Sequence, residues 1–274
     1  MEVVTAAGAQ ALPSTANVDA FRVEGIGLSI DGRSILNDIS LEFPAAKMTA
    51  LVGHNGSGKS TLLRLMARQA TPDKGQVSCG GRPVTSFRDR QFAREVAYLP
   101  QDVGSGAYMT VAELVASGRY PWHGALGRFG DADHRAVSEA LEATHLAPLR
   151  ERFVSTLSGG ERQRAWIAMM VAQRSKWLLL DEPTAALDVA HQVEVLSLLR
   201  QLAEDGGLGI AIVLHDINMA ARFCDRIHAL RGGEVVASGT GEDILRPETL
   251  KTIYGVEMGI VTPPEHGTPL AYVI

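Results

Sequence analysis

Short apolar runs and segments with helical spacing alternate along most of this chain. The runs occupy 48–52, 177–180 and 210–214, a pattern typical of parallel strands that are buried on both faces. Apolar residues at helical spacing predict helices at 60–67, 158–172, 190–204 and 216–223. Strands that alternate with helices predict an α/β fold, in which a parallel sheet lies between helices.

Two pairs of strand-like segments meet at glycine-containing turns, as antiparallel hairpins do. They are Phe21–Ile30 with Ile39–Phe43, and 227–230 with 234–238. Further short strands are expected at 76–79 and 96–100. We therefore expect an antiparallel β subdomain beside the parallel sheet.

A helical segment interrupts the α/β pattern after Gln101. Thr110 and Glu113 have the spacing of a capping box that opens a helix to about Ser117, and a second helix is expected at 133–145. Between them lies an aromatic, glycine-containing loop at 119–130. These patterns predict an α/β core at 19–101 and 159–240, an inserted helical lobe at 102–158, and a C-terminal extension at 241–274 that is irregular after Gly255.

Composition narrows the class of protein. The chain has 274 residues, 46% hydrophobic and 21% charged, which is ordinary for a globular protein, and its formal charge of −5 gives no reason to expect a nucleic-acid partner. No apolar run approaches the length that spans a bilayer. Residues 1–18 are expected to form a flexible leader rather than a secretory signal, because they carry no Lys or Arg. Cys79 and Cys224 lack the spacing of metal ligands, so free thiols are expected.

The stretch after the first apolar run carries the most specific chemistry. It reads G-x-x-x-x-G-K-S-T and comprises Gly53, His54, Asn55, Gly56, Ser57, Gly58, Lys59, Ser60 and Thr61. Its glycines permit a loop whose N–H groups turn toward a phosphate, Lys59 would contact the β- and γ-phosphates, and Ser60 would bind Mg²⁺. The alternative is a glycine-rich turn without a ligand. The order strand, loop, Lys-Ser and helix favours a nucleoside triphosphate site.

Two acidic residues follow the apolar run at 177–180. Asp181 would hold Mg²⁺, and Glu182 would polarise the attacking water near the γ-phosphate. The alternative is a pair of acids that cap the next helix.

The stretch Leu157-Ser-Gly-Gly-Glu-Arg-Gln163 discriminates most between kinds of nucleotide-binding protein. It resembles the LSGGQ signature of ABC-transporter ATPases, with Glu161 in place of the usual Gln. Ser158, Gly159 and Gly160 would form a second anion site at a helix N-terminus. The alternative is a capped helix that binds nothing. The resemblance implies an ABC cassette with a RecA-like parallel-sheet core, and a head-to-tail dimer in which each nucleotide lies between one copy's phosphate loop and the other copy's signature.

Other positions match this family residue by residue. Gln101 resembles the glutamine that reaches Mg²⁺ and the attacking water, and Asp188 resembles the loop residue at the dimer interface. His215 resembles the histidine that contacts the γ-phosphate, although a histidine after an apolar strand is more often structural. The resemblance thus assigns catalysis to Lys59, Gln101, Glu182 and His215.

The chain departs from the family where many members stack an aromatic residue on adenine. Ile30 stands at the nearest equivalent position. Adenine would instead lie against Ile30, the stem of Arg33 or Ile35.

Several longer segments resemble importers of the iron-siderophore, haem and cobalamin group, above all ferric hydroxamate import ATPases. They include Gly118–Phe129, Gly160–Gln173, His191-Gln-Val, Leu214–Ala221 and Ile253-Tyr-Gly. The resemblance implies an ATP- and Mg²⁺-dependent subunit, peripheral on the cytoplasmic face of the inner membrane. It would act with a permease, with a second copy of itself and indirectly with a substrate-binding protein.

Three points remain open. The cargo would be haem, cobalamin, ferric citrate or another siderophore instead of a hydroxamate complex. The chain would otherwise be a non-transport ABC ATPase, such as a DNA clamp or a ribosome factor. The absence of heptads and of a second cassette argues against the last class. The aromatic residues Tyr120 and Trp122 would contact the permease or belong to the core of the lobe.

Overall fold

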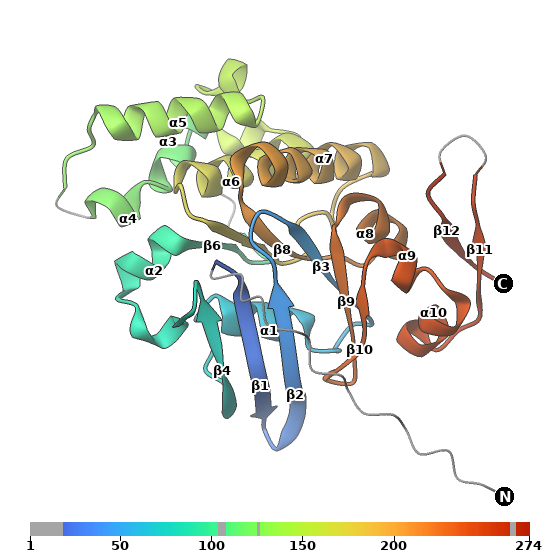
Figure 1. Ribbon diagram of the computed structural model, residues 1–274. Helices are drawn as coiled ribbons and strands as arrows, with labels where there is room; N and C mark the ends of the chain where they lie inside the picture. The colour runs from blue at the N-terminus through green and yellow to red at the C-terminus, as the bar shows by residue number, and fades with distance from the viewer. Residues whose placement is uncertain (1–18, 104–107, 125–126, 264–266) are drawn as a thin grey trace, which may run out of the picture.

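The computed structural model describes residues 19–103, 108–124, 127–263 and 267–274 (Figure 1). The expected leader at 1–18 lies outside the described residues, as does part of the aromatic loop.

A six-stranded sheet forms the centre of the core, in the order β10-β9-β3-β8-β7-β6. Neighbouring strands from β9 to β6 are parallel, and β10 is antiparallel to β9. Their bounds are β3 Met48–Val52, β6 Val96–Leu99, β7 Trp177–Leu180, β8 Gly209–Val213, β9 Arg226–Arg231 and β10 Glu234–Gly239. All residues of β3, β7 and β8 are buried, as the apolar runs predicted.

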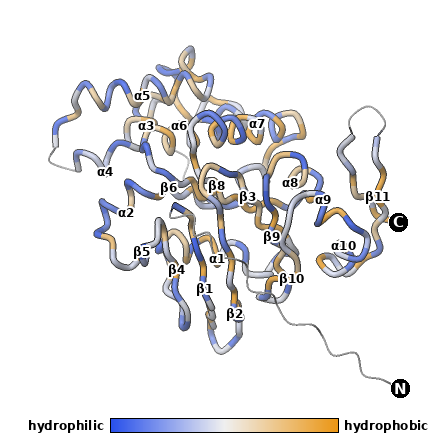
Figure 2. Tube along the Cα trace, viewed as in Figure 1, coloured by the Kyte–Doolittle hydropathy of each residue, from blue (hydrophilic) through white to orange (hydrophobic). Residues whose placement is uncertain are grey.

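Alternate residues of these strands face two separate apolar cores. Leu178 and Leu180 of β7 pack with helices α6 (Gly159–Ala172), α7 (Val189–Gly206) and α8 (Ile217–Phe223). Leu179 faces the other way, toward α1 (Lys59–Met66) and the antiparallel sheet. In Figure 2, hydrophobic and hydrophilic colours alternate along the turns of α7, as expected of a helix with one face on a core.

The antiparallel subdomain is a four-stranded sheet in the order β2-β1-β4-β5. Its strands are β1 Phe21–Ile30, β2 Arg33–Phe43, β4 Lys74–Cys79 and β5 Arg82–Pro83. β1 has the predicted bounds, whereas β2 begins at Arg33, before the predicted Ile39. Asp31 and Gly32 both have positive φ, so the two-residue turn pairs Ile30 directly with Arg33 and extends β2 through polar positions.

Helices α3 (Val111–Ser117) and α5 (Asp131–Ala143) form the lobe with one face of α6 (Figure 1). The predicted capping box is present, because Thr110 Oγ1 accepts from the Glu113 N–H and the Glu113 carboxylate accepts from the Thr110 N–H. In this part of the chain, two short helices were not predicted, α2 at Asp89–Glu95 and the single turn α4 at Tyr120–His123.

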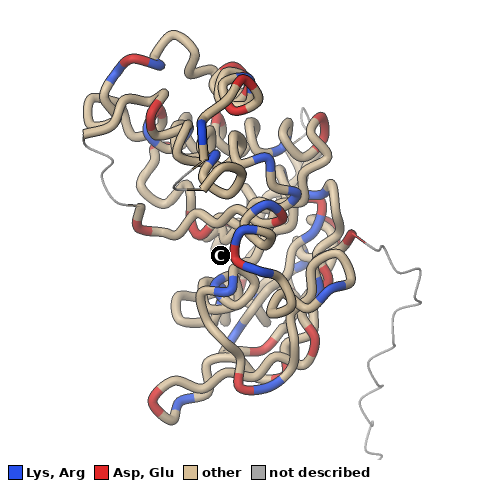
Figure 3. The backbone as a smooth tube through the Cα atoms, turned by 90° about the vertical axis from the view of Figure 1, so that its left-hand side faces the viewer, with Lys and Arg blue, Asp and Glu red and all other residues tan. Residues whose placement is uncertain are grey.

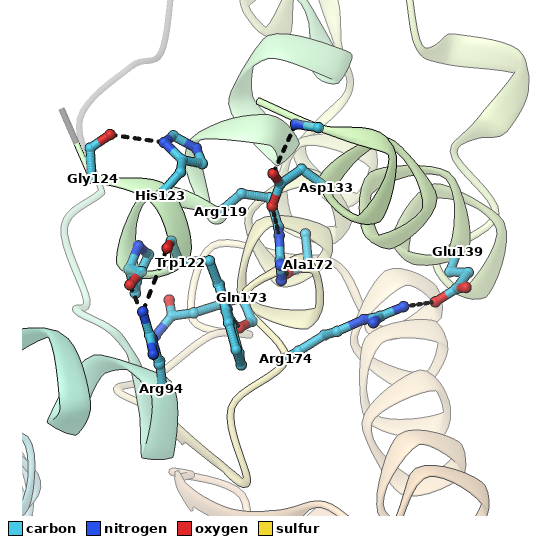
Figure 4. Close-up of polar contacts among 12 residues, drawn as sticks. Arg94, Arg119, Trp122, His123, Gly124, Asp133, Glu139, Ala172, Gln173 and Arg174 are labelled. Carbon is cyan, nitrogen blue, oxygen red and sulfur yellow. Dashed lines mark hydrogen bonds and ion pairs between the residues drawn. The ribbon is translucent and has the colours of Figure 1, made fainter. Parts of the chain in front are cut away.

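Figure 4 shows the joint at which the lobe meets the C-terminal end of α6. The buried Arg119 guanidinium pairs with Asp133 at 2.8 Å and also donates to the Ala172 carbonyl at 2.8 Å. The Trp122 indole N–H donates to the Gln173 carbonyl at 2.7 Å. The indole N–H of Trp122 therefore fastens α4 to the end of α6, although the side chain is 40% exposed, and Tyr120 is 52% exposed.

The C-terminal extension is more regular than predicted. It begins with α9 (Gly241–Ile244) and α10 (Pro247–Tyr254). After Gly255 it forms an antiparallel hairpin of β11 (Met258–Val261) and β12 (Leu270–Val273), so the prediction of an irregular tail after Gly255 was wrong. The hairpin pairs two short apolar segments across the proline-rich connection at 262–269, whose prolines indicate a loop but do not indicate that the segments on either side pair. Within the described residues, none of the helices combines the length and apolar character needed to cross a bilayer.

A buried histidine joins the two sheets. His228 of β9 is 1% exposed, and its Nε2–H donates to the Glu42 carbonyl of β2 at 3.2 Å. Its Nδ1 accepts from the Ser238 hydroxyl at 2.7 Å. The neutral ring thus has a partner at each nitrogen, and burial lowers the pKa of His228 from 6.5 to about 4.

This histidine should make the fold sensitive to acid. The unfolded chain binds a proton at His228 below about pH 6.5, whereas the folded chain resists it until about pH 4, so stability falls as pH falls across that range. At about 1.4 kcal/mol per pKa unit, the full loss is about 3 kcal/mol. Urea unfolding at several pH values should show a smaller loss for His228→Gln than for the wild type, and parallel pH curves would contradict this role.

Candidate functional site

The loop between β3 and α1 needs glycine at two positions. Gly53 and Gly58 have φ of 136° and 100°, in the region that side chains rarely adopt. A Cβ on Gly53 would lie 2.0 Å from the Leu230 carbonyl oxygen, and one on Gly58 would lie 2.5 Å from Leu36 Cδ2. Close packing against β9 and β2 therefore fixes the path of the loop into α1.

The interior of this loop suits a phosphate. The Lys59 ammonium group donates to the carbonyl oxygens of Gly53 and His54, each at 2.8 Å. Burial lowers the pKa of Lys59, while the carboxylates of Glu182 and Asp181 oppose the shift. The Ser57 hydroxyl is buried without a hydrogen-bond partner among the described residues. Together with the free N–H groups at the start of α1, these groups match the oxygens of an anion.

A hydroxyl and a carboxylate meet beside the loop. Ser60 Oγ donates to Asp181 Oδ1 at 2.7 Å, and Asp181 follows the last residue of β7. Burial raises the pKa of Asp181, the hydrogen bond from Ser60 opposes this, and the neighbouring Glu182 adds to it. Both side chains present oxygen atoms, the ligands that Mg²⁺ prefers.

Glu182 is held between two side chains from other strand ends. Its Oε2 accepts from Gln101 Nε2 at 2.8 Å, and its Oε1 lies 2.8 Å from His215 Nε2. Glu182 also has a φ of 51°, uncommon for a residue with a side chain, as occurs at functional sites. Gln101, also expected near Mg²⁺, contacts Glu182 in this structure.

Most of these residues line one pocket of about 390 Å³, whereas Gly53, His54 and Asp181 are not among its lining residues. It is lined by Ile35, Asn55, Gly56, Ser57, Gly58, Lys59, Ser60, Thr61, Gln101, Glu182 and His215. Of the three side chains considered for adenine, Ile35 lines the pocket, whereas Ile30 and Arg33 do not.

The signature residues lie outside this pocket, at the N-terminus of α6. Ser158 Oγ accepts from the Glu161 N–H at 3.3 Å, and Glu161 Oε2 accepts from the Ser158 N–H at 2.8 Å. This backbone hydrogen bond lowers the pKa of Glu161. A Gln side chain offers the same accepting oxygen, which explains why Glu is tolerated here.

Asp188 also lies outside the pocket, where it caps α7. Its Oδ1 accepts from both the N–H and the ring Nδ1 of His191, at 2.9 and 2.7 Å. These bonds lower the pKa of Asp188. The His191 ring packs on Gly160, where an added Cβ would lie 2.3 Å from His191 Cδ2. The sequence analysis gave His191 no role in the site, although its position three residues after Asp188 is that of a capping contact.

Comparison with known proteins places the chain in a family. The family model described as ABC transporter matches residues 36–185. The ferric enterobactin transport ATP-binding protein FepC of Escherichia coli (strain K12) is 41% identical over 256 residues, covering 93% of this chain and 94% of that protein. The iron(3+)-hydroxamate import ATP-binding protein FhuC of Bacillus subtilis (strain 168) is 40% identical over 253 residues, covering 92% and 94%.

Solved structures of ABC transporters have the same fold as this chain. An inward-facing ABC transporter described as of the metal-chelate type superposes with a TM-score of 0.81 at 26% identity, covering 93% of this chain and 96% of that chain. A bacterial ABC transporter cassette solved as a dimer has a TM-score of 0.70 at 25% identity, covering 80% and 98%. The predicted cassette, with its parallel core, antiparallel subdomain and inserted lobe, is confirmed. The chain belongs to the ABC transporter family, as one of its ATP-binding subunits.

Proposed function

We propose that this chain hydrolyses ATP to energise the import of iron(III)-hydroxamate siderophores through a membrane permease. The observation that carries the proposal is the position of Glu182, fixed by Gln101 and His215 at the mouth of a phosphate-loop pocket. A carboxylate held by two side chains beside a phosphate site is suited to take a proton from water.

The roles of the other side chains follow from their contacts. Lys59 and the N–H groups of the loop would bind the β- and γ-phosphates, and Lys59 would exchange its two carbonyl partners for phosphate oxygens. Ser60 and Asp181 would hold Mg²⁺, with Gln101 beside them, and bound Mg²⁺ would neutralise charge on the phosphates. His215 would keep Glu182 in place and contact the γ-phosphate.

The working unit would be a head-to-tail pair of chains. Ser158, Gly159, Gly160 and Asp188 lie outside the pocket of their own chain, so they would complete the pocket of a second copy. The similar cassette solved as a dimer supports the pairing of two copies. Gly160 and Asp188 both contact His191, so they would meet the partner as one surface.

The lobe would carry movement to the permease. Gln101 stands where the chain enters the lobe, and the exposed Tyr120 lies on the same lobe. The chain would act at the cytoplasmic face of the inner membrane as a peripheral subunit, and a substrate-binding protein would deliver the iron complex to the permease.

Nucleic acid is not proposed as a partner, since acidic and basic residues are interspersed along the described chain (Figure 3).

The proposal of a hydroxamate cargo rests on the resemblance of the lobe sequence to ferric hydroxamate import ATPases and on one relative that is named for hydroxamate import. Another relative of nearly equal identity is named for ferric enterobactin. A third, a hemin import ATP-binding protein from Pseudomonas putida, is 40% identical over 254 residues, covering 91% of this chain and 98% of that protein. Haem, cobalamin and ferric citrate remain the alternative cargoes. All three relatives are named for transport or import, which favours an import role over a non-transport role.

Replacing Glu182 by Gln should stop turnover while ATP still binds. The amide keeps the hydrogen bond with His215 but accepts a proton poorly, so the rate of ATP hydrolysis should fall by about 10²- to 10⁴-fold. Phosphate release and binding of a fluorescent ATP analogue should be measured together. Glu204→Gln, which makes the same exchange at an exposed position of α7, is the matched control. A near wild-type rate in Glu182→Gln would remove Glu182 from this role.

Uptake by cells tests the cargo. In cells that lack this gene, uptake of radiolabelled ferric hydroxamates should be lost and should return with the wild-type gene but not with Glu182→Gln. Ferric enterobactin, ferric citrate, haem and cobalamin should be offered in parallel. Loss of one of these instead would replace the proposed cargo, and unchanged uptake of all of them would contradict the transport role in those cells.

A further inference from the structure

The C-terminal extension contacts the phosphate loop and the helix after His215. In Figure 1, α10 and the hairpin stand beside α8 and α9, on the side of the core away from α2 and α4. The roles proposed above do not use this extension.

The first contact lies at the end of α10. The His54 ring donates from Nε2 to the Tyr254 carbonyl oxygen at 2.8 Å, and the two rings meet edge to face at 5.7 Å. The carbonyl of His54 in turn accepts from the Lys59 ammonium group at 2.8 Å. His54 thus links the end of α10 to Lys59 of the phosphate site through two hydrogen bonds, one from its ring and one to its carbonyl.

The local sequence makes that carbonyl available. Gly255 has a φ of 73° and its N–H donates to the Lys251 carbonyl, so the chain leaves the helix directly after Tyr254. The Arg231 guanidinium holds the neighbouring Thr252 carbonyl at 2.6 Å. The stretch Ile253-Tyr-Gly therefore presents a fixed acceptor to His54.

The second contact lies on α8. The Asn218 side chain donates to the Ala271 carbonyl at 3.0 Å and accepts from the Ala271 N–H at 2.7 Å, as a neighbouring strand would. The backbone N–H of Asn218 donates to Asp216 Oδ1 at 2.7 Å, and Asp216 caps α8 directly after His215. β12 is therefore fastened to the start of α8, the helix that directly follows His215 and its neighbour Asp216.

We propose that α10 and the β11–β12 hairpin form a brace that sets the geometry of the ATP site from both sides. His54 is a positioning residue for Lys59, and Asn218 is a positioning residue for His215. The inference rests on the proposed function, since it assumes that the pocket binds and hydrolyses ATP. Both contacts are specific hydrogen bonds to the site segments, whereas simple anchoring of the hairpin would need only apolar packing.

The two contacts should affect different kinetic quantities. His54→Leu removes the donor at similar size, and it should weaken binding of a fluorescent ATP analogue by about 3- to 10-fold, the effect of one lost hydrogen bond. His54→Gln keeps an N–H donor and should restore most of that affinity. Asn218→Leu should lower kcat by about 3- to 10-fold and change nucleotide affinity by less than about 2-fold, because it acts through His215.

The matched control breaks a polar contact elsewhere in the brace. Lys251→Ala removes the exposed ion pair with Glu257 and should leave both affinity and kcat unchanged. The brace is rejected if His54→Leu and Asn218→Leu behave like this control, if they lower only the Tm, or if only one of them changes its predicted quantity. A wild-type chain that neither binds nor hydrolyses ATP would instead defeat the proposed function.

Discussion

Parallel pairing of β3, β8, β7 and β6 brings the functional residues together. The carboxyl ends of parallel strands meet at one edge of a sheet, and each of these strands is followed there by polar residues. The phosphate loop follows β3, Gln101 follows β6, Asp181 and Glu182 follow β7, and His215 follows β8. Segments far apart in sequence thereby share one pocket, and any change in strand order would separate them.

Most of the core could be predicted because its signals are local. The apolar runs of β7 and β8 mark strands that are buried on both faces, and the glycines of the phosphate loop follow directly from the conformation that it needs. The resemblance added roles that spacing alone does not give. The sequence could not show that Glu182 pairs with both Gln101 and His215, since those contacts depend on how the strands are ordered in space.

The features that the sequence analysis missed depend on distant partners. β12 pairs with β11 across a long connection and is fastened by Asn218, which lies on another element. The ring of His191 packs on Gly160, a contact between two helix N-termini. The early start of β2 is different, because the Asp31-Gly32 turn was visible and only its effect on pairing was underestimated.

The site of a single chain is divided between two surfaces. The phosphate loop and Glu182 face the pocket, while the signature and Asp188 lie together elsewhere on the same chain, where the ring of the Asp188-bonded His191 packs on Gly160. The proposed composite site requires the start of α6 to meet the nucleotide of a second copy, because it lies outside the pocket of its own chain. The joint around Arg119 and Trp122 keeps the lobe attached to α6, so the signature and the lobe would move together.

The most direct test of the central claim is the mass of the Glu182→Gln chain in solution, with and without ATP and Mg²⁺. Sedimentation velocity should show a monomer without nucleotide and a dimer with it, since each pocket would then be closed by the signature of the other copy. Ser158→Arg in the same background should remain monomeric while still binding nucleotide. A Glu182→Gln chain that stays monomeric at saturating ATP would contradict the composite site.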